Sequence, residues 1–171
     1  MDFGKLEALA EKVRGASRAG VLVRLDEVWP GGEHEFVTLP AEARIPDIVE
    51  IREGEKTYLY SDRHMTRAYA EAAALSASGD PQRIIAATVR SDSAGYPRPT
   101  PVATFRGQPY YLSKEEVTAA VGRMRVSPQY ADINQVCASD GAEFLFSSDH
   151  LSREQAASMA EWIAVGRHDN P

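Results

Sequence analysis

The sequence predicts an α+β protein of two related halves, each with a β-hairpin followed by a helix. The first observation is an internal repeat: residues 58–70 return as residues 144–156, with five identities and four close exchanges over thirteen positions. The second is hydrophobic periodicity, which changes along the chain between the spacing of helices and that of strands. The third is a set of cap and turn residues at the boundaries of these stretches. A repeat at a constant offset indicates duplication of a structural unit.

The order of the matched segments predicts two halves, residues 1–78 and 79–171. Upstream of the main repeat, residues 9–17 align with residues 85–93. The first half is predicted as helix, β-meander and helix, and the second as helix, short strand, helix, β-hairpin and helix. Because halves of about 80 residues are near the lower limit for independent stability, we expect them to pack together as one body.

In the first half, apolar residues spaced three and four apart predict a helix that ends before Gly15. Two strand-like runs within residues 21–40 follow, and with the next hairpin they predict a four-stranded meander. The hairpin is expected to turn at Gly54, and Thr66 is placed to cap the helix behind it. The apolar stripe of the first helix consists of Leu6, Leu9, Ala10 and Val13.

In the second half, Asp80-Pro81 is typical of a helix N-cap and first turn. Prolines at alternate positions in residues 96–101 predict a surface crossover and argue against a central strand. A short strand is expected over residues 102–105, before a helix that opens with a capping box at residues 113–116. A hairpin that turns at Asp140-Gly141 and a last helix complete this half.

The last helix is expected to open with a second capping box, formed by Ser152 and Gln155. Aromatic residues alternate at equivalent positions of the two hairpins, which predicts the sheet face that packs beneath a helix. These residues are Tyr58, Tyr60, Phe144 and Phe146. Cys137 lies within a predicted strand with no basic neighbour in sequence, so a structural, partly buried role is expected.

Composition limits the classes of function. The net charge of −6 favours solubility and argues against a polyanion as the obvious partner. A single cysteine cannot form an internal disulfide or hold an iron–sulfur cluster, and no cofactor is expected. No apolar run approaches the roughly 18 residues of a membrane helix, and the N-terminal segment is an amphipathic helix pattern that contains acidic residues, unlike a basic, apolar signal sequence. We therefore expect a cytoplasmic protein without membrane contact.

Electrostatics indicate one candidate binding region. Residues 83–125 carry seven basic side chains against three acidic ones, in a chain that is acidic overall. This stretch and the proline-rich crossover are predicted to meet another protein, with solvated helix faces as the alternative. The candidate binding residues are Arg90, Arg98, Arg106, Arg123, Arg125 and Tyr96.

The order of helix, short strand, capped helix and hairpin is close to that of winged-helix DNA-binding domains. Nucleic-acid binding is therefore an alternative function. A wing that contacts phosphate usually carries lysine or arginine, whereas this hairpin carries Asp132, Asp140 and Glu143. The acidic hairpin makes nucleic acid the less favoured partner.

His64 and His150 are aligned by the repeat, each two residues before a predicted helix N-cap. A symmetric histidine site with Asp62 and Asp149 as further ligands would give a third function, an enzyme. In the structural alternative, each histidine orders a strand-to-helix corner. The sequence contains no P-loop, GxGxxG, HExxH or GxSxG motif, so we expect a protein that is not an enzyme.

Several short motifs of the second half resemble the YdhW-type proteins. They are Tyr96-Pro97-Arg98-Pro99, Tyr130-Ala131-Asp132-Ile133, Ser139-Asp140-Gly141, Ala160-Glu161-Trp162 and Asn170-Pro171. That family is named as a component of an oxidoreductase system, alongside ferredoxin-like and tungsten-type oxidoreductase subunits. The resemblance implies a non-catalytic accessory protein that binds another protein, such as an oxidoreductase subunit, and does not itself move electrons. It carries over no catalytic residue.

Overall fold

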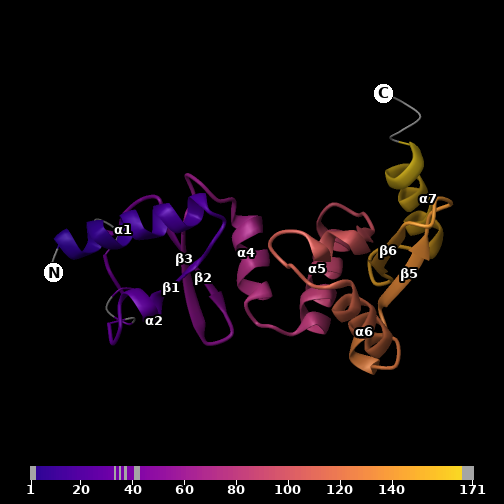
Figure 1. The fold of residues 1–171 in the computed structure, drawn as a ribbon, viewed down its shortest axis with the longest axis horizontal. Coiled ribbons are helices and arrows are strands. Elements are labelled where there is room, and N and C mark those ends of the chain that lie inside the picture. The colour runs from indigo at the N-terminus through magenta and orange to yellow at the C-terminus, as the bar shows by residue number, and fades with distance from the viewer. Residues whose placement is uncertain (1–2, 33, 35, 37, 41–42, 167–171) are drawn as a thin grey trace. The chain divides into compact units, whose positions relative to one another are not determined.

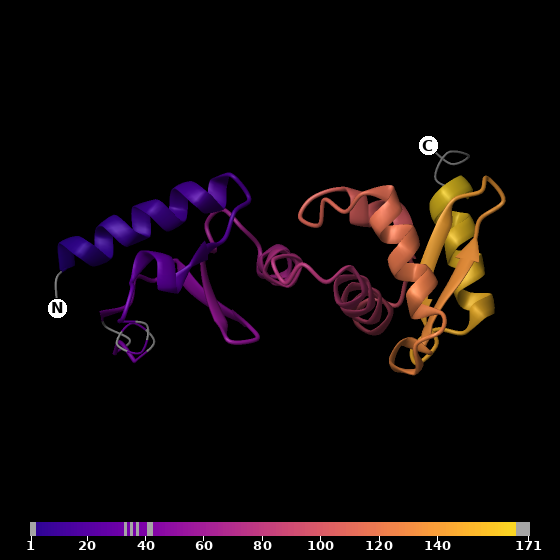
Figure 2. The same cartoon turned by 60° about the horizontal axis from the view of Figure 1, so that its bottom comes forward.

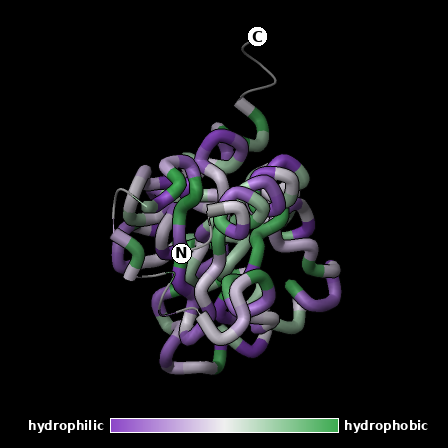
Figure 3. The backbone as a smooth tube through the Cα atoms, turned by 90° about the vertical axis from the view of Figure 1, so that its left-hand side faces the viewer, coloured by the Kyte–Doolittle hydropathy of each residue, from purple (hydrophilic) through white to green (hydrophobic). Residues whose placement is uncertain are grey.

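The computed structural model describes the chain except residues 1–2, 33, 35, 37, 41–42 and 167–171. The chain divides between Ser78 and Gly79 into two compact units. Each unit combines helices with one three-stranded antiparallel sheet, which confirms the predicted α+β class (Figure 1). Within single helices the chain alternates between hydrophilic and hydrophobic residues, as expected when one helix face is buried (Figure 3).

The first unit is built around strand β3. Its elements are α1 (Phe3–Arg18), β1 (Val23–Arg24), α2 (Leu25–Val28), β2 (Ile48–Glu53), β3 (Lys56–Ser61) and α4 (Arg67–Ser76). The strand order is β1-β3-β2. Gly54 turns the hairpin with a φ of 60°, a conformation that favours glycine. Leu59 packs in the core cluster of α1, whereas Tyr58 and Tyr60 pack with Ala70 and Ala74 of α4.

The second unit has the corresponding strand order, β4-β6-β5. Its elements are α5 (Pro81–Gly95), β4 (Thr100–Pro101), the 3-10 helix η2 (Val102–Arg106), α6 (Lys114–Met124), the 3-10 helix η3 (Pro128–Tyr130), β5 (Ile133–Cys137), β6 (Glu143–Ser147), α7 (Arg153–Glu161) and the π-helical turn η4 (Trp162–Gly166). The β5–β6 hairpin lies between α5 and α6 on one side and α7 on the other (Figure 2). Phe144 and Phe146 pack with Ala156 and Ala160 of α7, as the aromatic alternation predicts.

The predicted helix caps are confirmed. Thr66 Oγ1 accepts the Tyr69 N–H at the start of α4, and Asp80 caps α5 with Pro81 in its first turn. Both capping boxes are present, at Ser113 for α6 and at Ser152 for α7. Cap residues act within a few positions of themselves, so the sequence alone is sufficient to place them.

The predicted β-meander of the first unit is wrong. Its first run forms only the two residues of β1 and then turns into α2. In the second run, the Phe36 N–H donates to the Gly32 carbonyl at 2.9 Å, a helical spacing. Other residues of this run, 33, 35 and 37, lie outside the described residues. A strand requires a neighbouring strand, and β3 pairs instead with β1 and β2.

Helix α1 also differs from its prediction, because it continues through Gly15 to Arg18. A glycine inside a helix costs about 1 kcal/mol relative to alanine, which the tertiary contacts of the last turn can offset. Ser17 is buried in that turn, and its Oγ accepts the Ser61 N–H of β3 at 2.9 Å.

The strand predicted over residues 102–105 is wrong as well. Residues 102–106 form the 3-10 helix η2, in which Phe105 is fully buried while the two residues before it are exposed, so the alternation of a strand is absent. The strand lies two residues earlier, in the proline-rich crossover, where Thr100 is buried and its Oγ1 donates to Asp92 at 2.8 Å. As an edge strand, β4 can accommodate Pro101.

A buried network joins α1 of the first unit to the open end of its hairpin, where β2 begins and β3 ends. Arg14 donates to both oxygens of Asp47, at 2.6 and 2.9 Å, and Ser61 Oγ donates to the same carboxylate at 2.8 Å. The Ser61 N–H in turn donates to Ser17 Oγ. The Arg14 guanidinium holds the pKa of Asp47 well below its usual range, against the opposing effect of burial.

The second unit contains the same network at matched positions. Arg90 donates to both oxygens of Asp132 at 2.6 and 2.9 Å, Ser147 Oγ donates to Asp132, and the Ser147 N–H donates to Ser93 Oγ at 3.0 Å. Arg90 also lowers the pKa of Asp132. The matched residues have the sequence offsets of the repeat, 76 for the helix residues, 85 for the aspartates and 86 for the strand serines. A common origin of the two units remains a prediction.

Candidate binding grooves at the strand edges

Each unit has a pocket beside the start of the first strand of its hairpin. The pocket of the first unit has a volume of about 280 Å³ and that of the second about 220 Å³. Residues 48–50 of β2 line the first, and residues 133–135 of β5 line the second. These positions correspond at the offset of 85 that relates the two aspartates. Both strands lie at the edge of their sheet.

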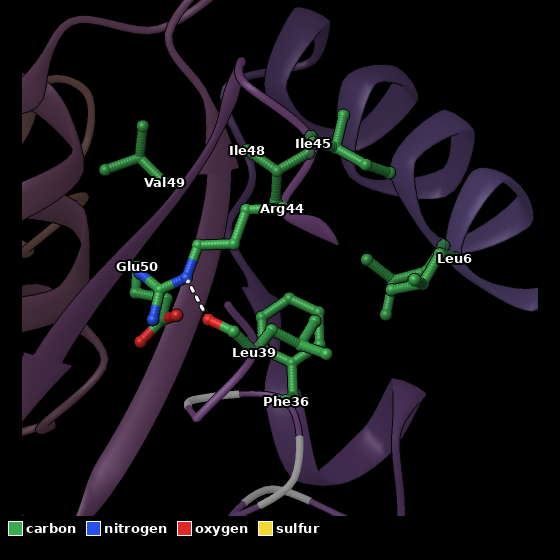
Figure 4. Close-up of a pocket in the computed structure, with 9 residues that line it drawn as sticks. Leu6, Phe36, Leu39, Arg44, Ile45, Ile48, Val49 and Glu50 are labelled. Atoms are coloured by element: carbon green, nitrogen blue, oxygen red, sulfur yellow. Dashed lines mark hydrogen bonds between the residues drawn. The ribbon is translucent and has the colours of Figure 1, made fainter. Parts of the chain in front are cut away.

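The pocket of the first unit is mainly apolar (Figure 4). Leu6 and Leu9 of α1 form one wall, with Phe36, Leu39, Ile45, Ile48 and Val49 around them. Two charged side chains, Arg44 and Glu50, point toward each other at one side (Figure 4). The Arg44 Nε–H donates to the Leu39 carbonyl at 2.9 Å. Because opposite charges face each other, this pocket presents little net charge to a ligand.

The pocket of the second unit, the β5 groove, combines an apolar floor with two cationic side chains. Met124 and Leu145 are buried at its floor, and Arg125 and Arg153 stand at its rim, both exposed. The full lining is Val121 and Met124 of α6, its C-cap Arg125, Ile133, Asn134 and Gln135 of β5, Leu145 of β6 and Arg153 of α7. No carboxylate is part of this lining.

Gln135 occupies the centre of the β5 groove. Arg125 Nη2 donates to the Gln135 side-chain oxygen, and Arg153 Nη1 donates to the Gln135 backbone carbonyl at 3.2 Å. The Gln135 side-chain amide donates to Glu143 at 2.6 Å. Both arginines are thus held by neutral oxygen acceptors, and their positive charge is available to a ligand.

The backbone of β5 points N–H and C=O groups away from β6 along its outer edge. The Ser148 N–H donates to Asp132 O at 2.8 Å and the Ala138 N–H to Ala142 O at 2.9 Å. The backbone groups of Asp132 and Ala138, which flank β5, therefore face β6. In an antiparallel ladder every second residue points its N–H and C=O away from the partner strand. The outward residues are therefore Ile133, Gln135 and Cys137. The contact of Arg153 with the Gln135 carbonyl agrees with this register.

Cys137 is exposed at this edge, so the prediction of a partly buried cysteine is wrong. Its position at the end of an edge strand explains the exposure, because one side of such a strand has no neighbour. The local sequence suggested an interior strand, which the strand order does not provide.

The structure distributes the predicted basic residues over different roles. Arg90 is half-exposed, pairs with Asp132 in the network of the second unit and also donates to the Gln129 carbonyl at 2.8 Å, so it contributes to holding the fold together. Arg98 lies 3.5 Å from Asp92, which partly neutralises it. Arg106 and Arg123 are exposed, and Tyr96 is 80% exposed at the end of α5. Of the predicted set, Arg125 is the one that lines the β5 groove.

The two histidines are exposed, each in its own unit. Their backbone N–H groups make the same turn, donating to the Ser61 and Ser147 carbonyls at 3.1 Å. His64 Nε2 also accepts a hydrogen bond from Arg18 at 3.2 Å. In the described part of the chain, no three or more His, Cys, Asp or Glu side chains are placed to hold a metal ion. The structural interpretation of the histidines stays a prediction, consistent with these turn contacts.

Sequence reasoning missed Arg153 and Gln135. A signal for Arg153 was available in the repeat. Its counterpart Arg67 pairs with Glu71 one helical turn later, at 2.8 Å, whereas the position equivalent to Glu71 is Ala157. The ion pair that neutralises Arg67 is therefore lost in the second unit. Gln135 carries no signal, because its role comes from strand order.

The fold and the two grooves define an α+β protein whose units each present an open strand edge beside a helix. In the described part of the chain, no helix combines the length and the apolar composition needed to span a bilayer.

The YdhW C-terminal domain matches residues 79–168, which begin at the boundary between the units. Uncharacterized protein YdhW of Escherichia coli (strain K12) is 34% identical over 173 residues, covering 96% of this chain and 80% of that protein. The chain therefore belongs to the YdhW family, and the resemblance inferred from the short motifs is confirmed. No solved structure matches the chain significantly.

Proposed function

We propose that the protein is a non-catalytic accessory protein that binds another protein through the outer edge of β5. The observation that carries this proposal is the row of outward N–H and C=O groups at Ile133, Gln135 and Cys137, next to the β5 groove. An exposed strand edge can add a strand from a partner, whose main chain supplies the affinity while neighbouring pockets supply specificity. In this structure β5 provides the edge and also lines the pocket.

A subunit of an oxidoreductase is the partner that we propose. Support comes from the setting that the YdhW resemblance implies, an oxidoreductase system in which this chain contacts a redox enzyme. The single cysteine, exposed on β5, cannot by itself supply the four thiolates of an iron–sulfur cluster. The chain would then position or protect a partner that carries the redox centre.

The charges around β5 favour a protein partner over nucleic acid. In a winged-helix arrangement, α6 and the hairpin would approach the phosphates. The first turn of α6 carries Glu115 and Glu116, and the hairpin carries the exposed Asp140 and Glu143. Nucleic acid laid across α6 and the hairpin would bring phosphates against these carboxylates, whereas a strand added to β5 lies beside Arg125 and Arg153. The acidic groups therefore count against nucleic acid, whose non-specific affinity comes mostly from neutralisation of phosphates by lysine and arginine.

The proposal is tested by capture from native extract with three versions of the protein. Gln135→Pro removes an outward N–H that does not pair with β6, so the hairpin ladder is retained. Gln135→Ala is the matched control, because it loses the same side chain but keeps the N–H. We expect the wild type and Gln135→Ala to retain the same partner, identified by mass spectrometry as an oxidoreductase subunit, and Gln135→Pro to lose it.

Equal capture by all three versions would show that β5 is not the docking edge. Circular dichroism of each variant shows whether the fold is retained. If Gln135→Pro unfolds, a soluble peptide copy of the captured segment replaces it as the competitor. Displacement of the partner by that peptide, and no displacement by a copy methylated at alternate backbone nitrogens, is then the expected result.

A further inference from the structure

We infer that the segment added to β5 is extended and acidic, with two consecutive carboxylates that bind Arg125 and Arg153. This inference rests on the proposed function, which it deepens by giving the chemistry of the partner. It draws on the charge of the groove, on the position of the two arginines relative to the sheet, and on the difference between the two units.

The charge of the β5 groove is complementary to an acidic ligand. None of the described residues forms an ion pair with Arg125 or Arg153, and both side chains are exposed at the rim. A carboxylate that reaches either arginine gains a charge-assisted hydrogen bond, which is about twice as strong as a neutral one. The neutral acceptor Gln135 that now holds both arginines would be replaced by a stronger one.

The two arginines approach the edge of β5 from opposite faces of the sheet. Arg125 is the C-cap of α6, and it contacts the side chain of Gln135, which lies opposite Leu145 on the α6 face. Arg153 begins α7, and its guanidinium carbon lies 6.0 Å from the centroid of the Phe146 ring, on the α7 face. Side chains of a strand alternate between the two faces. Consecutive residues of an added strand would therefore meet Arg125 and Arg153 in turn.

The apolar floor of the groove sets a second requirement. On the α6 face, Met124 and Leu145 are buried and Val121 is half-buried, beside Arg125. The residue two positions from the carboxylate that binds Arg125 lies on this same face. An apolar side chain there would cover the floor, so the predicted ligand has a pair of adjacent acidic residues flanked by β-branched apolar residues.

The first unit explains why the acidic specificity belongs to β5. At the equivalent positions, Arg67 is paired with Glu71, and the pocket itself contains Glu50 facing Arg44. An acidic segment placed beside β2 would meet Glu50 at the strand position that Gln135 occupies in β5. The two grooves thus share a location but differ in charge.

Fluorescence anisotropy with the full-length protein tests the inference. The probe is a labelled, acetylated peptide of about eight residues, built from threonine and valine with two adjacent glutamates at its centre. Control peptides have the glutamates separated by one residue, lysines in their place, or methyl groups on alternate backbone nitrogens. We expect the adjacent-glutamate peptide to bind more tightly than each control.

Protein variants locate the site. Since a hydrogen bond to a charged group contributes about 1.5–3 kcal/mol, Arg125→Ala and Arg153→Ala should each weaken binding by about tenfold or more. Arg67→Ala in the first unit is the matched control and should leave the affinity unchanged. Raising the salt concentration should weaken binding of the wild type more than that of the two groove variants.

Three outcomes would overturn the inference. They are equal affinity for the adjacent and separated glutamate peptides, no effect of Arg125→Ala and Arg153→Ala, or tighter binding of a fluorescent oligonucleotide than of any peptide. If Gln135→Pro abolishes capture of the partner but the protein shows no preference for acidic peptides, the proposed function is retained and the acidic ligand is rejected. If Gln135→Pro leaves capture unchanged and acidic peptides are not preferred, both proposals are rejected.

Discussion

Replacing Ser93 with alanine should destabilise the second unit through one buried hydrogen bond. Ser93 and Ser147 are fully buried, and the Ser147 N–H donates to Ser93 Oγ at 3.0 Å. Ser93→Ala leaves that N–H without its acceptor in a place that the surrounding core shields from water. An unsatisfied buried donor costs about 1–3 kcal/mol. Alanine recovers about 0.5 kcal/mol through its better helix propensity, so the expected net loss is roughly 0.5–2.5 kcal/mol.

The matched control lies two residues away on the same helix. Ser91 is exposed on α5, so Ser91→Ala should gain the same helix propensity without losing a buried bond, a change within about 0.5 kcal/mol. In the first unit, Ser17→Ala should behave as Ser93→Ala does, because the buried Ser61 N–H donates to Ser17 Oγ at 2.9 Å.

Urea unfolding measures these changes. Circular dichroism follows the unfolding of the whole chain. Tryptophan fluorescence follows the two units, because Trp29 lies in the first and Trp162 in the second. The midpoint should fall for Ser93→Ala at constant slope. A midpoint for Ser93→Ala equal to that of Ser91→Ala would refute the assignment of the network as a stabilising element.

Three further predictions concern the caps, pH and the histidines. Ser152→Ala removes the N-cap of α7 and should lower the free energy of unfolding by about 1 kcal/mol in urea titrations, while Ser158→Ala, an exposed control in the same helix, changes it little. Because the folded-state pKa values of Asp47 and Asp132 lie below the ordinary value of about 4, their stabilisation is present above that pH and should be lost as the pH falls below it; thermal melts between pH 6 and pH 2 test this, and Asp132→Asn should flatten the decline. His64→Ala should shift the melting temperature equally with and without a chelator, and a shift that appears only without the chelator would restore the metal-ligand interpretation.

The elements that sequence reasoning predicted correctly are those fixed by nearby residues. Ser113, Ser152, Thr66 and Asp80 cap their helices through bonds to residues two or three positions away. The hairpins were recognised because turn residues separate two apolar runs, and because each copy of the repeat clarifies the other. The aromatic face beneath the helix followed from the alternation of a strand.

The errors concern features that depend on distant partners. A two-residue strand such as β1 exists because β3 lies beside it, and the local sequence 23–28 does not reveal this. The ion pair of Arg90 could not be predicted from the local sequence, because its partner Asp132 is 42 residues away. The β5 groove was not predicted for the same reason: its lining comes from α6, β5, β6 and α7, and the open edge of β5 follows from strand order.

Amide hydrogen exchange on β5 tests the central claim most directly. In the protein alone, the N–H groups of Asn134 and Val136 pair with β6, while those of Ile133, Gln135 and Cys137 face outward. With the adjacent-glutamate peptide bound, NMR-detected exchange should slow at the three outward amides and stay unchanged at the two inner ones. Unchanged exchange at all five positions under saturating peptide, or protection confined to α6, would contradict strand addition at β5.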